Sequence, residues 1–553
     1  MKTRNQVLEV AALRQFDLVV IGGGIVGAGV AQNAASRGLS VLLLERADFA
    51  SGTSSRTTKL IHGGLRYLEQ LRFGMTRELC QERALLEQLA PHMVRDFSFI
   101  LPLLKDDSFF AWKAGIGLTL YDMLASGVGG AHRHSQITPK ELLEYVPAMS
   151  AKLVSGGLRF HDCITDDSRL VIEVIKSACS LGALAINYCE AIGFEKTDGK
   201  IAAVNCHDRY SGGDITIRCK ACINATGVWA DEVAQMVGGG WKKRITPAKG
   251  THIVVQPSAL ETNSALFLPT KDNRYVFVVP WQRALMIGTT DTAYTGPLEH
   301  PLPTSAEIDY LISVVNTYAV KPIGRRDIVA AWAGLRPLIS NEAAAPNGSP
   351  INTSQLSREY EIVAMLDGMI VVIGGKLTNY RLMADQVVEK ALTQLPPEVT
   401  AAATQPRTHR IMLGGWSDKN DFLTLTASIA SQARKLGIEP ATLEHLTASY
   451  GTDAQAVIDL VEKEPGLNSR VCPDFPPIMA EVVFCVLNEM AVSLEDLLCR
   501  RMRLGVIHQR QCLEAGPKVA MLIQSLLGWD NSRTDLELQS LEGMLQEHIA
   551  CYS

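Results

Sequence analysis

The sequence predicts an α/β protein that begins with a Rossmann-type nucleotide-binding unit and ends in an α-helical domain. Residues 16–46 have the pattern of a strand, a glycine-rich turn, a helix and a second strand. Further strand patterns alternate with helices up to about residue 395. Beyond Gly415 the apolar residues recur almost wholly at helical spacing. The first two observations predict the α/β part, and the third predicts the helical domain.

The glycine-rich turn Gly22-x-Gly24-x-x-Gly27 predicts a dinucleotide site. Glycines let backbone N–H groups approach a pyrophosphate at the N-terminus of a helix. The second strand, residues 41–44, ends in Glu45, whose carboxylate can hydrogen-bond ribose hydroxyls. The order of these parts predicts a bound dinucleotide, but it does not choose between NAD and FAD.

Composition narrows the class of protein. The chain has 553 residues, 47% of them hydrophobic and 20% charged, which suits a folded protein of roughly two to four domains. A net charge of −5 gives no electrostatic reason to expect a nucleic-acid partner. The 12 cysteines are scattered, mostly in apolar segments, which favours a reducing compartment. Cys219-x-x-Cys222 has no second pair, so we predict no metal site. We expect no signal peptide and no membrane span.

The predicted organisation has four parts. Residues 1–15 form a short, poorly specified arm, and residues 16–395 hold the nucleotide-binding domain with an interleaved second domain. A loop rich in Asn, Ala, Pro and Ser occupies residues 340–357. Residues 396–414 form a linker, and residues 415–553 form a helical domain without a chemical motif. Residues 493–496 resemble a capping box within that domain.

The remaining elements follow from the apolar patterns. The hydroxyl-rich loop that begins at Ser51 is suited to hydrogen-bond a cofactor. Ala225 and Gly227 lie at the end of a predicted strand and are small enough for close approach to a cofactor. A helix that begins at Lys376, after Gly374 and Gly375, would place its N-terminus at the cofactor's far end. Helices are predicted at 73–89, 169–179, 230–237, 305–318 and 376–395, and strands at 199–205, 215–221, 222–227, 251–255, 275–279, 284–288, 327–337 and 369–373.

Several long motifs in this order resemble those of the FAD-dependent glycerol-3-phosphate dehydrogenases. The longest is Ser54-Ser-Arg-Thr-Thr-Lys-Leu-Ile-His-Gly-Gly-Leu-Arg-Tyr-Leu-Glu69. The others lie at residues 224–229, 249–255, 287–291, 333–338 and 374–381. The resemblance covers residues 16–395, and the tail around residues 497–504 is similar to the family's C-terminal domain. Arg56 departs from the pattern, because a small residue is usual there.

The resemblance implies a fold and a reaction. The fold is a glutathione-reductase-like FAD-binding Rossmann domain with an antiparallel-sheet substrate domain, followed by a helical domain. The reaction is oxidation of sn-glycerol 3-phosphate to dihydroxyacetone phosphate, with electrons passed through FAD to membrane quinone. The chain resembles the aerobic, single-polypeptide type, because it lacks the cysteine-rich C-terminal region of the anaerobic catalytic subunit. An oxygen-using oxidase of the same fold, acting on glycerol 3-phosphate or an amino acid, is one alternative, and an RNA-modifying flavoprotein is another.

Oxidation of a secondary alcohol requires a base near the hydroxyl as a hydride leaves carbon for flavin N5. Histidine suits this role, since its neutral form is well populated near neutral pH. We take His252 as the candidate base and His62 as the alternative. For the phosphate, the resemblance indicates Arg66 and Arg336, with Tyr67 as a hydroxyl donor, because a guanidinium can bind two phosphate oxygens together.

Lys376 has two candidate roles, which the sequence leaves open. It could stabilise the negative charge of reduced flavin, or it could contact the substrate phosphate. The resemblance also places a group of residues along the FAD. These are Thr53, Ser54, Thr58, Lys59, Ala225, Gly227, Gly374, Gly375, Leu377 and Thr378, with Gly22, Gly24, Gly27 and Glu45 at the ADP half.

The membrane is a further expected partner. Residues 109–124 are apolar and aromatic with few charges, which fits a helix lying on a membrane surface and equally a buried core helix. The implied location is the cytoplasm, at the cytoplasmic face of the inner membrane. A homodimer is also among the expected assemblies.

Overall fold

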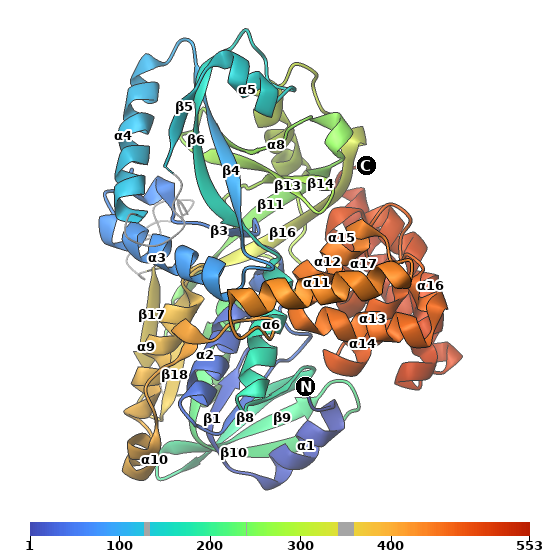
Figure 1. The fold of residues 1–553 in the computed structure, drawn as a ribbon. Helices are drawn as coiled ribbons and strands as arrows, with labels where there is room; N and C mark the ends of the chain where they lie inside the picture. The colour runs from blue at the N-terminus through green and yellow to red at the C-terminus, as the bar shows by residue number, and fades with distance from the viewer. Residues whose placement is uncertain (126–132, 239, 341–358) are drawn as a thin grey trace.

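The computed structural model describes residues 1–125, 133–238, 240–340 and 359–553, so the predicted loop at 340–357 lies outside the described residues except for Ser340. In these ranges the strands form two sheets, of eight and ten strands. Figure 1 shows the first sheet in the lower half of the molecule, the second in the upper half, and the C-terminal helices along one side of both. The predicted α/β class with a helical C-terminal domain is confirmed.

The first sheet has the parallel core expected of a nucleotide-binding domain. Its inner strands are apolar and buried, as they must be when helices cover both faces of a parallel sheet. β17 and β18 pair antiparallel, and β8 and β9 extend β10 as an antiparallel ribbon. In spatial order the strands are β17 (Tyr360–Ala364), β18 (Met369–Gly374), β10 (Asp214–Asn224), β1 (Phe16–Ile21), β2 (Val41–Leu44) and β7 (Leu184–Ile186), with β9 (Lys200–Asp208) and β8 (Cys189–Thr197) off this path.

Helices cover this sheet close to the predicted positions. α2 packs between α6 and α9, and Gly29 makes this possible because an added Cβ would lie 2.7 Å from the ring of Tyr380. The helices are α2 (Ile25–Ser36), α6 (Asp167–Ser180), α7 (Ala230–Val237) and α9 (Tyr380–Leu392). α9 begins four residues later than predicted, so Lys376 lies in the turn between β18 and the helix and does not begin the helix.

The N-terminal residues are not the poorly specified arm that the sequence suggested. They form α1 (Arg4–Leu13), which begins with a capping box between Thr3 and Gln6. Val7 and Ala11 are buried, and Arg4 forms a 2.5 Å ion pair with Asp208. The mixed, weakly amphipathic sequence hid this helix, because its stability comes from contacts with distant strands.

The second sheet is antiparallel, as predicted, except that β12 and β4 pair in parallel. Its strands are β3 (Leu60–Ile61), β4 (Arg95–Leu104), β5 (Ser135–Ile137), β6 (Val154–Ile164), β11 (Ile245–Val255), β12 (Ala265–Pro269), β13 (Tyr275–Trp281), β14 (Ala284–Gly288), β15 (Thr292–Ala293) and β16 (Ile328–Ile339). The helices around it are α3 (Phe73–Leu89), α4 (Ser108–Ala125), α5 (Pro139–Tyr145) and α8 (Ser305–Tyr318).

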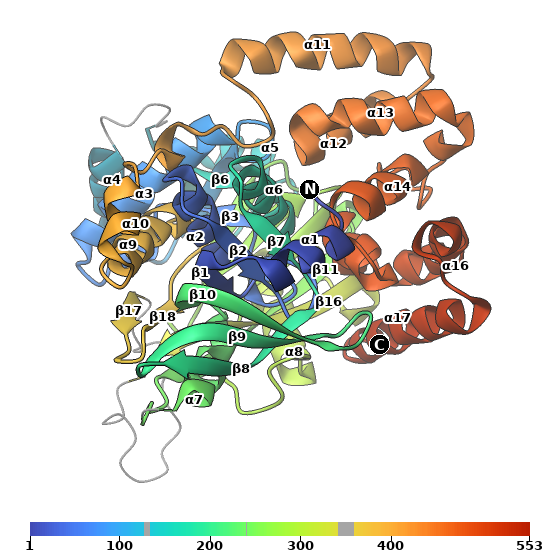
Figure 2. The ribbon, with the colours of Figure 1, turned by 90° about the horizontal axis from the view of Figure 1, so that it is seen from below.

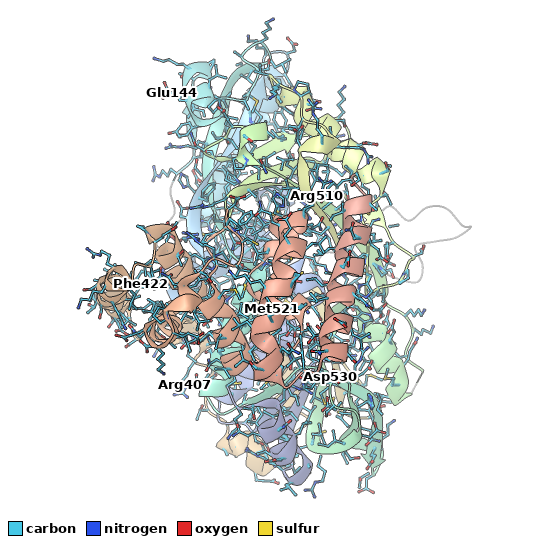
Figure 3. The ribbon with its side chains drawn as sticks, turned by 90° about the vertical axis from the view of Figure 1, so that its right-hand side faces the viewer. Glu144, Arg407, Phe422, Arg510, Met521 and Asp530 are labelled. Carbon is cyan, nitrogen blue, oxygen red and sulfur yellow. The ribbon has the colours of Figure 1, made fainter. Side chains whose placement is uncertain are left out.

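The C-terminal part is helical, as predicted. Figure 2 shows its helices stacked along one side of the molecule, and Figure 3 shows α16 and α17 side by side, with Arg510 and Met521 on α16 and Asp530 at the start of α17. They are α11 (Lys419–Lys435), α12 (Pro440–Tyr450), α13 (Ala454–Lys463), α14 (Met479–Asn488), α15 (Leu504–Ile507), α16 (Gln509–Leu527) and α17 (Asn531–Ala550), with a π-helical turn at Asp496–Arg501. The expected linker contains a short helix, α10 (Pro397–Ala402). The domain boundaries themselves remain a prediction.

Parallel strand order places the functional segments together. β1, β10 and β18 run in the same direction, so their carboxyl ends share one edge of the sheet. Gly22, Ala225 and Gly375 each follow one of these ends directly. Ligands of open α/β sheets bind at this edge.

Candidate active site

Two adjoining cavities lie at the carboxyl edge of the first sheet. The first has a volume of about 360 Å³ and the second about 250 Å³. The two share lining residues from three parts of the chain, so they form one elongated site. The shared residues are Thr53, Arg56, Thr57, Pro337, Gly374, Gly375, Lys376 and Leu377.

The first cavity contains the predicted dinucleotide cradle. Gly22 has φ +109°, and an added Cβ would lie 2.5 Å from the Ala225 carbonyl oxygen, so only glycine fits this turn. Gly24 caps α2, whose N-terminus lines the cavity at Ile25. The N–H groups at such a terminus suit a pyrophosphate. Gly27 does not line the cavity, because its role is close packing: an added Cβ would lie 1.8 Å from the Gly22 carbonyl oxygen.

Glu45 lies at the end of β2 and is held by backbone donors. Its carboxylate accepts hydrogen bonds from the N–H groups of Gly23, at 2.7 Å, and Ala47, at 2.8 Å. Burial raises the pKa of Glu45, although these two donors oppose the shift. The carboxylate is therefore fixed in the cavity wall, where a ribose would need it.

Most of the other predicted cofactor residues also line this site. Ser54 additionally accepts a 3.0 Å hydrogen bond from the N–H of Ile25, so the hydroxyl-rich loop is tied to the start of α2. Thr53, Ser54, Ala225, Gly227, Gly374, Gly375 and Leu377 line the first cavity, and Thr58 and Thr378 line the second. The elongated cavity, the glycine cradle and the fixed acid together fit an extended dinucleotide such as FAD.

Lys59 is the exception. It lines neither cavity, and its ammonium forms a buried 3.0 Å ion pair with Asp167, 4.8 Å from the ring centre of Trp332. Burial, followed by the charge of Arg503, lowers the pKa of Lys59 to about 8. The prediction that Lys59 lines the cofactor is therefore wrong, because the chain turns this side chain into the protein behind the site at a residue with φ +58°.

The second cavity brings together every predicted catalytic and substrate-binding residue. They come from the loop after β3, from β11 and β16 of the second sheet, and from the turn after β18. Its lining includes His62, Arg66, Tyr67, His252, Arg336 and Lys376. Sequence motifs separated by up to about 300 residues therefore meet in one pocket.

His252 forms part of the floor of this pocket. Its ring stacks on Trp332 with centroids 4.1 Å apart, and its Nε2 lies 3.0 Å from the Thr58 hydroxyl. Gly288 makes room for the ring, because an added Cβ would lie 2.2 Å from it. Burial lowers the pKa of His252 well below its usual value, and Lys59 and Arg336 lower it further. The imidazole is thus neutral, and its Nδ1 has no hydrogen-bond partner among the residues that the structure describes.

His62 is held differently. Its Nδ1 accepts a 3.1 Å hydrogen bond from the N–H of Gly64. Burial lowers the pKa of His62, so this ring is also neutral. Since Nδ1 acts as the acceptor, the proton of the neutral ring lies on Nε2. His62 therefore presents a donor from Nε2, whereas the Thr58 hydroxyl can either donate to or accept from His252.

The three predicted cations Arg66, Arg336 and Lys376 line the same pocket, together with Arg56. Arg336 donates to the Thr289 hydroxyl at 3.2 Å and lies 3.4 Å from a carboxylate oxygen of Asp291. The Lys376 ammonium lies 5.2 Å from the ring centre of Tyr67, and the Arg66 guanidinium lies 5.7 Å from the same centre. This arrangement suits a small anionic ligand in a partly desolvated pocket.

The helical domain contributes residues that sequence reasoning missed. Glu495 and Arg500 line the first cavity, although the sequence of this domain showed no chemical motif. Arg500 and Arg501 both bind the buried carboxylate of Asp48, at 2.6 and 2.7 Å, three residues after Glu45. The arginines in the otherwise apolar segment 497–504 could have indicated such contacts, because arginine side chains are rarely buried without a charged partner.

The fold and the site define a class of protein, the flavin-dependent oxidoreductases with a Rossmann FAD domain and a second, antiparallel sheet. A family model described as "FAD dependent oxidoreductase" matches residues 17–381. A second, described as "C-terminal domain of alpha-glycerophosphate oxidase", matches residues 406–534.

Named relatives are more specific. The chain is 34% identical to "Glycerol-3-phosphate dehydrogenase" of Mycobacterium leprae (strain TN), over 97% of this chain and 89% of that protein. It is also 34% identical to "Aerobic glycerol-3-phosphate dehydrogenase" of Bacillus subtilis (strain 168), over 90% and 89%. The crystal structure of the glycerol-3-phosphate dehydrogenase from Bacillus halodurans complexed with FAD matches with a TM-score of 0.81 and 27% identity, over 99% and 98% of the two chains. The chain therefore belongs to the family of FAD-dependent glycerol-3-phosphate dehydrogenases, as the sequence motifs predicted.

Proposed function

We propose that this enzyme oxidises sn-glycerol 3-phosphate to dihydroxyacetone phosphate and passes the electrons to membrane quinone. The observation that carries the proposal is the second cavity, where two neutral histidines and four cations, one of them Arg56, line the wall beside the dinucleotide cradle. The substrate follows from the names of the relatives and from the chemistry of this pocket. FAD supplies the hydride acceptor when it is bound.

The cations account for the phosphate. Arg336 is the proposed main phosphate ligand, because its guanidinium is anchored on one side by Thr289 and lines the pocket with the other. Arg66 is the proposed second ligand, and Tyr67 supports both Arg66 and Lys376 through its ring. Lys376 keeps both candidate roles, since it lines both cavities.

The histidines account for proton movement. We assign His252 as the base that takes the hydroxyl proton, because its neutral ring has a nitrogen without a partner among the described residues and a hydroxyl neighbour that accommodates either tautomer. We assign His62 as a donor to a substrate oxygen, because Gly64 fixes its proton on Nε2. Phe160, Phe267 and Phe277 complete the wall and restrict water.

Anaerobic titration of the purified holoenzyme with sn-glycerol 3-phosphate tests this function. We expect the visible flavin absorbance to bleach, and we expect glycerol, which lacks the phosphate, to bleach it only at far higher concentration. Absence of bleaching with glycerol 3-phosphate would refute the proposal. Peroxide released in stoichiometric amounts under air, with no reoxidation by quinone, would instead assign the oxidase alternative.

We also propose that α4 rests on a membrane surface. Phe109 is 72% exposed and Trp112 is 65% exposed, so α4 is not the buried core helix that the sequence left as an alternative. Exposed aromatic residues on a helix suit the interface of a bilayer. Within the described part of the chain, no helix combines the length and apolarity that a membrane span requires.

Vesicle sedimentation tests this contact. Replacing Phe109 and Trp112 by serine should weaken binding to vesicles of anionic lipid. Met521→Ser is the matched control, because Met521 is 70% exposed on α16, on the side of the molecule that Figure 3 shows and away from α4. Equal binding by all variants would refute the assignment of α4.

A further inference from the structure

A buried polar network lies behind His62, where α3, α4 and β6 each contribute one side chain. Its centre is the carboxylate of Asp162, which lines the second cavity and is 4% exposed. One oxygen of this carboxylate accepts hydrogen bonds of 2.6 Å from Arg83 and 2.6 Å from the Tyr121 hydroxyl. Arg83 and Tyr121 are also buried, and neither lines the cavity. None of the three is among the proposed proton or phosphate ligands.

The network ends on the backbone next to His62. The N–H of Gly63 donates to the Tyr121 hydroxyl at 2.8 Å and lies 3.2 Å from the same Asp162 oxygen. Only glycine fits here, because an added Cβ would lie 2.4 Å from the Tyr121 hydroxyl and 2.4 Å from the Cys80 sulfur. The hydroxyl therefore reaches the backbone through the space that a side chain at position 63 would occupy.

We propose that Tyr121 is a positioning residue for the oxidation, because its hydroxyl fixes the turn His62–Gly64 and so holds the His62 ring in its place in the second cavity. Asp162 and Arg83 orient that hydroxyl. The inference rests on the proposed function, and it adds a residue of α4 that acts on the reaction through His62.

The charges in the network fix the direction of each hydrogen bond. Burial, followed by the charge of Asp162, raises the pKa of the Tyr121 hydroxyl well above its usual value, so this hydroxyl keeps its proton. The proton is donated to the Asp162 carboxylate, which can only accept, and the lone pairs of the Tyr121 oxygen then accept from Gly63. Arg83 compensates the charge of Asp162, since a buried carboxylate needs a charged partner. The hydroxyl is thus held in one orientation.

The turn needs support from outside because two of its three residues are glycines. A glycine backbone has more accessible conformations than that of any other residue, and Gly64 has φ +74°. The N–H of His62 donates to the Thr378 hydroxyl at 3.2 Å, which ties the turn to the segment after β18. The bond from Gly63 to Tyr121 ties it to α4. Such support matters because a donor in an active site must stay within about 0.5 Å of its productive place.

Removal of one oxygen atom tests this role. Tyr121→Phe keeps the ring and deletes the hydroxyl, and Asp162 still has Arg83 as its charged partner. Tyr318→Phe is the matched control, because the side chain of Tyr318 is also buried and its hydroxyl donates to the Pro269 carbonyl at 2.7 Å, outside both cavities. Each variant loses one hydrogen bond between a hydroxyl and the backbone, so a general loss of stability should affect both alike.

The measurement is the anaerobic rate of flavin reduction in the holoenzyme at saturating glycerol 3-phosphate, expressed per bound flavin. We expect Tyr121→Phe to lower this limiting rate by about three- to tenfold, since loss of the His62 donor itself costs about tenfold at most. In a His62→Asn background the same substitution should cause no further loss, because the group through which Tyr121 acts is already absent. Tyr318→Phe should leave the rate unchanged in either background.

Three other results would overturn the inference. An unchanged limiting rate in Tyr121→Phe would show that the hydroxyl positions nothing. An equal loss with and without His62→Asn would show a structural role that is independent of His62. If Tyr121→Phe yielded no FAD-loaded protein while Tyr318→Phe did, the hydroxyl would serve folding and the inference would be equally wrong. Failure of the proposed function is seen separately, because glycerol 3-phosphate would then leave the flavin of the unsubstituted enzyme oxidised.

Discussion

Replacing His252 and His62 separately by asparagine should separate proton transfer from substrate positioning. Asparagine at 252 keeps a polar side chain near Thr58 but cannot accept the substrate proton. Loss of a general base typically costs about 10²–10⁴-fold in rate. Asparagine at 62 can still accept from the Gly64 N–H, so it loses only the Nε2 donor. One such hydrogen bond contributes about 0.5–1.5 kcal/mol, which corresponds to about tenfold at most.

The measurement is the anaerobic rate of flavin reduction, with glycerol 3-phosphate carrying hydrogen or deuterium at C2. We expect His252→Asn to lower the limiting rate far more than His62→Asn. His207→Asn is the control, because His207 is exposed on β9 and pairs with Asp214 at 2.7 Å, outside both cavities. If His62→Asn caused the larger loss, the two roles would have to be exchanged. Equal, small losses from both would show that another group takes the proton.

Three further predictions concern charge. Arg336→Leu should raise KM for glycerol 3-phosphate at least about tenfold with a smaller change in kcat, because it removes a charged phosphate ligand; steady-state kinetics with a quinone acceptor measure this, and a loss confined to kcat would contradict it. Lys59→Met should raise the pKa of His252, since the charge of Lys59 is among those that lower it. The acid limb of the rate–pH profile should therefore move to higher pH. An unmoved limb would exclude His252 as the titrating base. Asp48→Asn should cost about 3–5 kcal/mol of stability, because it removes the carboxylate that buried Arg500 and Arg501 share and leaves Arg501 only Glu489 at 3.5 Å; denaturant midpoints of the holoenzyme measure this loss. Burial raises the pKa of the Asp48 carboxyl, but the charges of Arg501 and Arg500 outweigh this effect and hold the pKa below 3.8. This stabilisation is therefore complete at neutral pH and is lost as the pH falls below about 4 through the folded-state pKa. The Asn variant should lose less stability in acid than the parent, and parallel acid profiles would contradict this.

Sequence patterns predicted those elements whose signals are local. The helices Phe73–Leu89 and Ser305–Tyr318 have the predicted bounds. The second also has a capping box between Thr304 and Glu307, which is a signal for its start within four neighbouring residues. The glycine turn after β1 was equally clear, because its spacing is a local signal; an added Cβ at Gly27 would meet the Gly22 carbonyl oxygen, whereas at Gly22 it would meet Ala225 from a distant strand.

Predictions that depended on distant contacts were less successful. Residues 4–13 form a helix that is buried against the first sheet, and the capping box between Thr3 and Gln6 was a local signal for its start that the prediction did not use. Lys376 was expected to begin a helix, but Gly374 and Gly375 both have positive φ, and the turn continues until Asn379. The family motif contains Lys59 together with Thr58 and His62, which line the second cavity, but the motif could not show that the Lys59 side chain faces away from it.

The most distant of these contacts explains why the helical domain matters for the site. Arg503 donates to Asp167 at 2.8 Å and to the Ser55 carbonyl at 2.8 Å, so the helical domain is bonded to the hydroxyl-rich loop. Asp167 also binds Lys59, which lies against Trp332, and Trp332 carries the ring of His252. Asp167 lies between Lys59 and Arg503 and compensates both charges, and Asp166 lies 3.4 Å from Arg503 as a second carboxylate; such partners matter because an unpaired buried charge is costly. Docking of the helical domain therefore completes the wall behind His252, although the domain contributes no residue to the second cavity in the part of the chain that the structure describes.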